Sequence, residues 1–223
     1  MAFEFNKNAE VRLIHVGRRG VPVTLIDSVF SDPDGVAARG FSADYARDLN
    51  NLYPGVRAIV PQDLSEAFSA CLKCEVKHCE SFFSVVMTPS QDLLPIQCIP
   101  HYDSTDPNLL AAVIYLCDNR FSGTSFYRHR RTGYEEITAE NQQNYRLALD
   151  YDMRAHGPPK KAYVNGSTQL FEVTFSSELK FNSAIVYPGR ALHAGTIPET
   201  FTPPKDRGEW RLTITSLMVR KPL

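Results

Sequence analysis

Residues 109–128 read LLAAVIYLCDNRFSGTSFYR and contain two apolar runs joined by a polar turn. The first run, Leu109–Cys117, holds β-branched and aromatic side chains that favour a strand. The second run, Thr124–Arg128, follows a Ser-Gly turn signal. We therefore expect two consecutive strands here. Further short runs with turn signals at irregular spacing indicate a β-sandwich or a small barrel.

The flanking sequence extends this pattern in both directions. Further strands are expected at Val11–Val16, Val21–Phe30, Phe82–Thr88, Leu94–Ile99, Gln169–Phe175, Ser183–Tyr187 and Trp210–Val219. A helix is expected after Asp32 and Pro33, a capping side chain followed by proline at the first helical position. A second helix is expected from Pro61 to about Cys79 on apolar residues at helical spacing: Leu64, Phe68, Cys71 and Leu72. The predicted class is α+β and mainly β, with helices first and an antiparallel double sheet after them.

The length of the chain bounds its organisation. At 223 residues, with no internal repeat, it fits one domain. We expect N-terminal strands and supporting helices in 1–90, and the β core of the same domain in 91–223. A polar stretch, 132–166, is expected to form an excursion or a lid.

The composition excludes some classes of partner. Lysine plus arginine (24) balances aspartate plus glutamate (25), so no overall charge argues for nucleic acid or an anionic membrane. No signal peptide and no apolar run of ~18 residues is found. Five cysteines, an odd number, favour reduced thiols. We expect a cytoplasmic protein with a small-molecule or peptide substrate, and a homodimer as the commonest oligomeric state.

A candidate metal site begins at His101-Tyr102-Asp103. Alternate residues of an extended segment share a face, so the imidazole and the carboxylate of this segment can project together. Two histidines and one carboxylate leave positions on Fe(II) open for other ligands. We expect His193 as the third ligand, because it follows the strand Ser183–Tyr187 and a Pro-Gly turn.

A His-x-acid pair is weak by itself, because a chain with six histidines and 25 acidic residues produces such pairs by chance. A second pair, His78-Cys79-Glu80, lies in the segment predicted to be helical, where residues two apart do not face each other. Cys71 and Cys74 with His78 and Cys79 form an alternative zinc cluster. It is disfavoured, because cysteines of a helix belong in the core and no second ligand pair lies nearby.

Arg211 is the second part of the candidate site. It lies 18 residues after His193, in a strand-like segment where Thr213 and Thr215 share its face. An arginine that points inward from a buried strand needs an anionic partner. The carboxylate of a co-substrate fits its planar fork, and a protein acid across the sheet is the alternative.

In chain order these motifs resemble the 2-oxoglutarate/Fe(II) dioxygenase superfamily, particularly its prolyl-hydroxylase-like branch. Within that branch, the segment Phe126–Arg130 is similar to one found in a bacterial group. The pieces that carry the resemblance span about residues 94–219 and are Pro100–Asp103, Ala112–Leu116, Ser122–Phe126, Ala184–His193 and Arg211–Thr215. The resemblance implies a double-stranded β-helix (jelly roll) supported by the N-terminal helices.

The resemblance also implies the cofactors and the reaction. Fe(II) would be held by His101, Asp103 and His193, with O₂ as the oxidant and 2-oxoglutarate as co-substrate. The implied reaction hydroxylates a small molecule, an amino acid or a peptide side chain.

The far carboxylate of 2-oxoglutarate would lie on Arg211, assisted by Tyr115 and Thr215. One departure from the family's pattern is a long insert, Ile197–Gly208, which we expect to form a rim loop.

Two questions stay open at this point. Arg128, His129 and Arg131 belong to a basic segment with alternating faces, which either captures an anionic substrate group or forms a solvated hairpin. Two other functions also remain: a catalytically silent jelly-roll binding module, and a cupin-type metal enzyme that does not use 2-oxoglutarate. A dependence of activity on Arg211 and on 2-oxoglutarate separates the oxygenase from the cupin-type enzyme.

Overall fold

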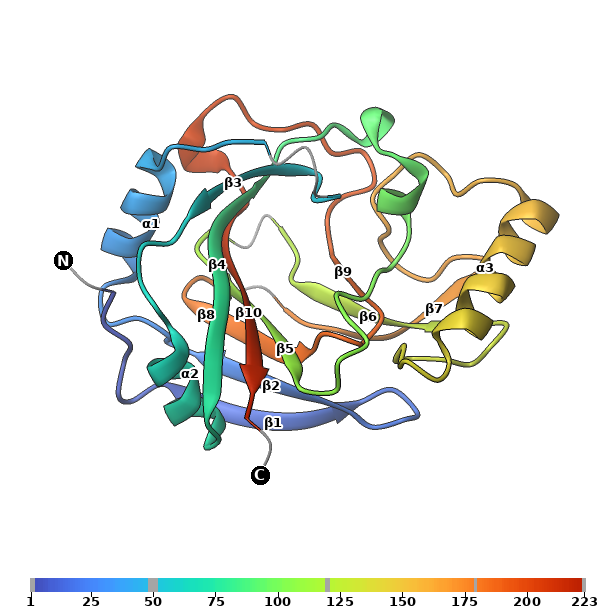
Figure 1. Ribbon diagram of the computed structural model, residues 1–223. Coiled ribbons are helices and arrows are strands. Elements are labelled where there is room, and N and C mark those ends of the chain that lie inside the picture. The colour runs from blue at the N-terminus through green and yellow to red at the C-terminus, as the bar shows by residue number, and fades with distance from the viewer. Residues whose placement is uncertain (1–2, 48–51, 119–120, 179, 222–223) are drawn as a thin grey trace.

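Two antiparallel sheets form the centre of the computed structural model, which describes residues 3–47, 52–118, 121–178 and 180–221 (Figure 1). In spatial order the seven-stranded sheet contains β1 (Glu10–Val16), β2 (Val21–Asp27), β8 (Ser183–Pro188), β5 (Leu109–Tyr115), β10 (Leu212–Arg220), β4 (Val76–Val86) and β3 (Gly55–Ile59). The three-stranded sheet contains β7 (Phe171–Ser176), β6 (Thr124–His129) and β9 (His193–Gly195). The expectation of a mainly β protein with antiparallel sheets is confirmed.

The chain changes sheet repeatedly in its second half. β5, β8 and β10 belong to the large sheet, whereas β6, β7 and β9, which come between them in sequence, belong to the small one. Segments that are far apart in the sequence therefore meet in the space between the two sheets.

The helices lie on the outside of the sheets (Figure 1). They are α1 (Pro33–Ser42), α2 (Ser65–Leu72) and α3 (Gln142–His156), with 3₁₀ turns η1 (Ser90–Asp92), η2 (Pro95–Cys98) and η3 (Arg207–Glu209). The Asp32 carboxylate accepts the Gly35 N–H at 3.0 Å and caps α1, as the sequence predicts. None of the helices in the described ranges combines the length and the apolar character needed to cross a lipid bilayer.

Alternate residues of the central strands face two different cores. Ile114 of β5 and Leu212 and Ile214 of β10 pack with the helices on one face of the large sheet. Tyr115 and Ile185 pack on the opposite face, toward the small sheet. This alternation leaves Thr213 and Thr215 of β10 directed between the sheets, where the candidate site lies.

The expected strand at Leu94–Ile99 is wrong, because residues 95–98 form the 3₁₀ turn η2. Proline at position 95 suits the first residue of a helical turn. The Gln97 side chain accepts the Leu94 N–H at 2.8 Å, which closes the turn. An apolar run of this length does not by itself separate a strand from a turn.

The second helix is shorter than expected. It ends at Leu72, where Lys73 adopts a left-handed conformation (φ 53°, ψ 33°), and residues 76–86 form β4. The reason given against His78-Cys79-Glu80 is therefore wrong, since this backbone is extended. The side chains of His78 and Cys79 lie outside the described part, so the zinc alternative is not tested.

Candidate metal centre

A backbone bridge brings His101 and His193 together. The His101 N–H donates to the His193 carbonyl at 2.9 Å, and the His193 N–H donates to the His101 carbonyl at 2.8 Å. Directly paired residues place their side chains on one face, and the two imidazole centroids lie 4.3 Å apart. Asp103 is held next to them because its N–H donates to the Gly189 carbonyl at 2.7 Å.

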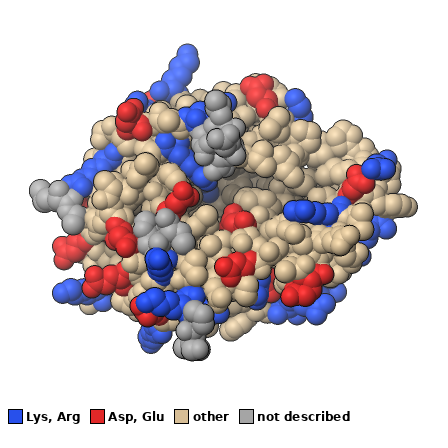
Figure 2. All heavy atoms as spheres, viewed as in Figure 1, with Lys and Arg blue, Asp and Glu red and all other residues tan. Residues whose placement is uncertain are grey.

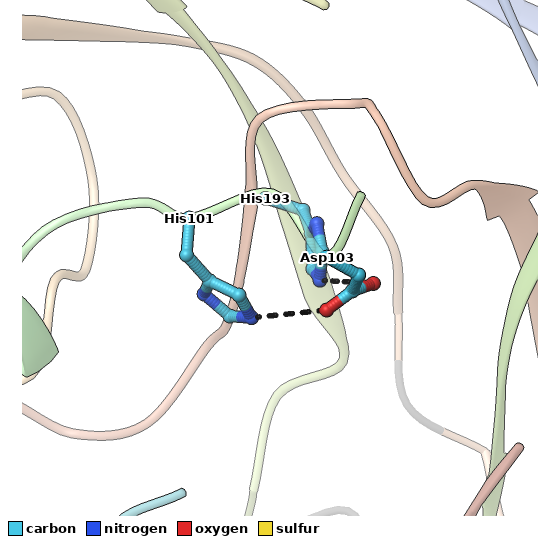
Figure 3. Close-up of side chains that lie close together, drawn as sticks. All are labelled: His101, Asp103 and His193. Atoms are coloured by element: carbon cyan, nitrogen blue, oxygen red, sulfur yellow. Dashed lines mark ion pairs between the residues drawn. The ribbon is translucent and has the colours of Figure 1, made fainter. Parts of the chain in front are cut away.

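The three side chains converge on one point (Figure 3). His101 Nε2 lies 3.8 Å from Asp103 Oδ1, and His193 Nε2 lies 3.7 Å from Asp103 Oδ2. Ligand atoms that share a metal at right angles lie ~3 Å apart. Small side-chain rotations would therefore bring all three onto one ion. Among the residues whose side chains are described, this is the only group of three potential ligands within 4.8 Å of one another.

Both imidazoles are suited to donate a lone pair. His193 is buried, and its Nδ1 lies 2.9 Å from the Ala191 carbonyl, to which Nδ1–H donates, so that Nε2 is the nitrogen directed toward Asp103. About half of the His101 side chain is exposed where it lines the cavity. Desolvation by the surrounding protein and the neighbouring His193 nevertheless lower the pKa of His101 to about 4, and Asp103 opposes this shift. A neutral imidazole is the form that binds a metal.

The cluster opens into a cavity of about 560 Å³ between the sheets. Figure 2 shows this face of the molecule hollowed near its centre, with basic and acidic side chains around the hollow. The same cavity is lined by Arg57, Arg211, Thr213 and Thr215. The sequence prediction that Arg211, Thr213 and Thr215 share an inward face is confirmed.

Arg211 is a buried cation whose partners are carbonyl groups. It is 5% exposed, and its Nη2 donates to the carbonyls of Ser122 (3.3 Å) and Gly123 (3.1 Å). Its Nε is buried without a hydrogen-bond partner. Within the described ranges no carboxylate pairs with Arg211, so the alternative of a protein acid across the sheet finds no support there. A buried guanidinium of this kind is able to accept an external anion.

Tyr115 and Thr215 differ in their access to the cavity. Tyr115 is fully buried, its hydroxyl is 2.7 Å from Thr124 Oγ1, and the Arg211 guanidinium lies 5.8 Å from its ring centre. Burial raises the Tyr115 pKa, and Arg211 opposes this shift. Thr215 lines the cavity, and its hydroxyl is 2.8 Å from Ser84 Oγ.

The structure does not bring the basic segment to the cavity. Arg128 forms an ion pair with Glu172. His129 is completely buried with Nε2 3.2 Å from Asp152 Oδ2, and Arg131 Nε lies 2.7 Å from Asp152 Oδ1. The faces alternate as the sequence predicts, but Arg128, His129 and Arg131 each meet a carboxylate of the protein itself.

Sequence reasoning missed Arg57. It lies on β3, a strand that was not expected, and it lines the cavity. The available signal was the segment Gly55–Ile59, in which an arginine stands between two apolar residues, Val56 and Ala58.

Several solved structures are similar to this chain at low sequence identity. AviO1 from Streptomyces viridochromogenes Tue57 is 13% identical, with a TM-score of 0.47, over 95% of this chain and 93% of that one. SnoN, a non-haem α-ketoglutarate-dependent epimerase from nogalamycin biosynthesis, is 11% identical, with a TM-score of 0.48, over 90% and 78%. HygX from Streptomyces hygroscopicus, with nickel and 2-oxoglutarate bound, is 11% identical, with a TM-score of 0.45, over 88% and 82%. These values are too low to assign a reaction to this chain.

No curated protein matches the sequence. A family model does match, and it covers residues 7–218, which is nearly the whole chain. The chain therefore belongs to the family described as "Family of unknown function (DUF6445)".

Proposed function

We propose that this protein is a non-haem Fe(II), 2-oxoglutarate-dependent oxygenase built on a double-stranded β-helix. One observation carries the proposal: the cluster of His101, Asp103 and His193 opens into the same cavity as the guanidinium of Arg211, which no acid of the described residues neutralises. The first group fits a divalent metal, and the second fits the far carboxylate of 2-oxoglutarate.

The repeated change of sheet from β5 to β10 supports the fold part of this proposal. In a double-stranded β-helix, the strands of the two sheets face each other and side chains of both line the space between them. Here His193 comes from the small sheet and Arg211 immediately precedes β10 of the large one. The two halves of the site would thus be held on opposite walls of one cavity.

The residues of the chain divide the work. His101 and His193 would donate lone pairs to the metal, and Asp103 would supply a negative charge and an oxygen ligand. Arg211 would orient 2-oxoglutarate, with Thr215 on the same wall of the cavity. Fe(II) with 2-oxoglutarate supplies the oxidation of a C–H bond by O₂, so that 2-oxoglutarate, O₂ and substrate give succinate, CO₂ and an alcohol.

The test is anaerobic titration of metal-free protein with Fe(II) and then 2-oxoglutarate, followed by visible absorption. We expect a weak band that requires both additions and is lost in His193→Ala and in Arg211→Ala. No band, together with no 2-oxoglutarate binding by calorimetry, would remove the oxygenase proposal. A band without succinate release across a substrate screen would instead favour a binding module.

A further inference from the structure

Arg57 is a second guanidinium on the wall of the cavity. In the register of the large sheet, Arg57 of β3 pairs with Ser84 of β4, which pairs with Thr213 of β10. Directly paired residues share a face, so Arg57 points to the same side as Thr213. Its neighbours Val56 and Ala58 pack on the other side, in the core beneath the helices.

Two aromatic rings hold the Arg57 guanidinium. Its Cζ lies 4.4 Å from the ring centre of Tyr53 and 5.3 Å from that of Phe82. Cation–π contacts of this kind position a cation without neutralising it. The Arg57 Nε is buried and has no hydrogen-bond partner. Glu80 lines the same cavity, but no ion pair joins it, or any other acid of the described ranges, to Arg57.

Arg57 and Arg211 are not equivalent. The Arg211 guanidinium is tied to the carbonyls of Ser122 and Gly123 and is assigned above to the co-substrate. The Arg57 guanidinium is held by two aromatic rings and has no carboxylate partner among the described residues, so it is available to bind a different anion. Holding a partly buried charge in this way is costly unless a ligand supplies the opposite charge.

We propose that Arg57 binds an acidic group of the substrate, and that the substrate is therefore an organic acid, either a carboxylate or a phosphate ester. This inference rests on the proposed function, because it takes the cavity beside the cluster to be the place where the substrate is oxidised. Leu52 and Ile96 also line the cavity and are 58% and 46% exposed. These two side chains provide an apolar surface for the carbon skeleton of the acid.

The test compares acids with neutral molecules that have the same carbon skeleton. Protein loaded with Mn(II) and 2-oxoglutarate is titrated by calorimetry with 3-phenylpropionate and 3-phenylpropionamide, and with 2-phenylethyl phosphate and 2-phenylethanol. We expect at least one acid to bind about ten-fold or more tightly than its neutral partner, since a charge-assisted bond is lost in the neutral compound. The two pairs distinguish a carboxylate from a phosphate site.

Substitutions of Arg57 test whether this residue causes the tighter binding of the acid. Arg57→Gln should abolish it while leaving the affinities for Mn(II) and 2-oxoglutarate unchanged. Arg57→Lys should keep part of it, because the charge remains but the planar fork is lost. Arg12→Gln is the matched control, since Arg12 is exposed on β1, the opposite edge strand of the same sheet. Thermal unfolding of each variant confirms that it is folded.

The inference is overturned if neither acid binds better than its neutral partner, or if the preference survives in Arg57→Gln. If Arg57→Gln is unfolded, Arg57→Lys provides the test. An undiminished preference for the acid over its neutral partner in that variant contradicts the proposed contact. Failure of the proposed function has a different signature: 2-oxoglutarate would show no Mn(II)-dependent binding, while the acid preference of Arg57 would persist in metal-free protein.

Discussion

His101 and His193 exchange two backbone hydrogen bonds, of 2.9 and 2.8 Å, although 92 positions of sequence separate them. The bridge joins the loop after η2 to the first residue of β9. Each imidazole is therefore positioned by the backbone of the other, and the candidate site exists only when both segments are in place.

Removal of one imidazole should abolish metal binding. We expect His193→Ala to lower the affinity for Mn(II) by about 100-fold or more, since loss of residues that merely orient ligands already costs 10–100-fold. Calorimetry measures the affinity. His15→Ala is the control, because His15 is exposed on β1, and it should bind Mn(II) as the native protein does. Equal affinity in His193→Ala would exclude His193 as a ligand.

Replacement of Arg211 separates a functional from a structural role. Arg211→Met keeps the aliphatic part of the side chain but removes a buried charge that no acid of the described ranges neutralises. We expect the free energy of unfolding of the ligand-free protein to change by less than about 1 kcal/mol, because the cost of burying an unneutralised charge offsets the two hydrogen bonds that Nη2 donates. Binding of 2-oxoglutarate to the Mn(II) form should weaken at least about ten-fold. A large loss of stability with unchanged 2-oxoglutarate binding would point to a structural arginine.

Gly17 and Gly20 have nearly the same φ, and alanine substitutions at these two positions test the contact made by Glu135. Gly17 and Gly20 have φ of +70° and +69°. A Cβ at Gly17 would lie 2.3 Å from Glu135 Oε2, whereas nothing lies within 4 Å of one at Gly20.

Gly20→Ala should therefore lose only the backbone term, about 1–2 kcal/mol. Gly17→Ala should lose about 1–3 kcal/mol more, because the displaced Glu135 carboxylate accepts the N–H groups of Arg18 and Arg19 at 3.0 and 2.9 Å. Urea denaturation of both variants gives the difference, and equal losses would show that Glu135 adapts without cost.

His129 should make the stability of the protein depend on pH. Burial lowers the pKa of His129, and the nearby Asp152 only partly opposes the shift. The unfolded chain, where the histidine pKa is about 6.5, then binds the proton more readily than the folded one. Stability from this residue is present above about pH 6.5 and falls as the pH drops below it. In His129→Gln the dependence between pH 5 and 7 should be weaker, and an identical slope would contradict the shift.

The sequence by itself determined the features that depend on local periodicity. Leu109–Tyr115 and Thr124–His129 are strands at the expected places, and Arg211, Thr213 and Thr215 face the cavity together. These conclusions needed only the two-residue repeat of a strand, which each segment carries within itself. The grouping of His101, Asp103 and His193 was expected from an extended His-x-Asp segment and from a histidine after a Pro-Gly turn, and the family resemblance implied the same three ligands. The strand expected just before this segment, Leu94–Ile99, was wrong.

Only the tertiary structure decided which charged groups remain available to a ligand. Arg128 and Arg131 look like a binding patch in the sequence, yet Glu172 and Asp152 neutralise them in the fold. Arg57 had only a weak local signal, its place between Val56 and Ala58, yet it faces the cavity without an acidic partner among the described residues. The physical reason is that charge pairing depends on distances of a few ångströms between residues far apart in the chain, and no local pattern encodes those distances.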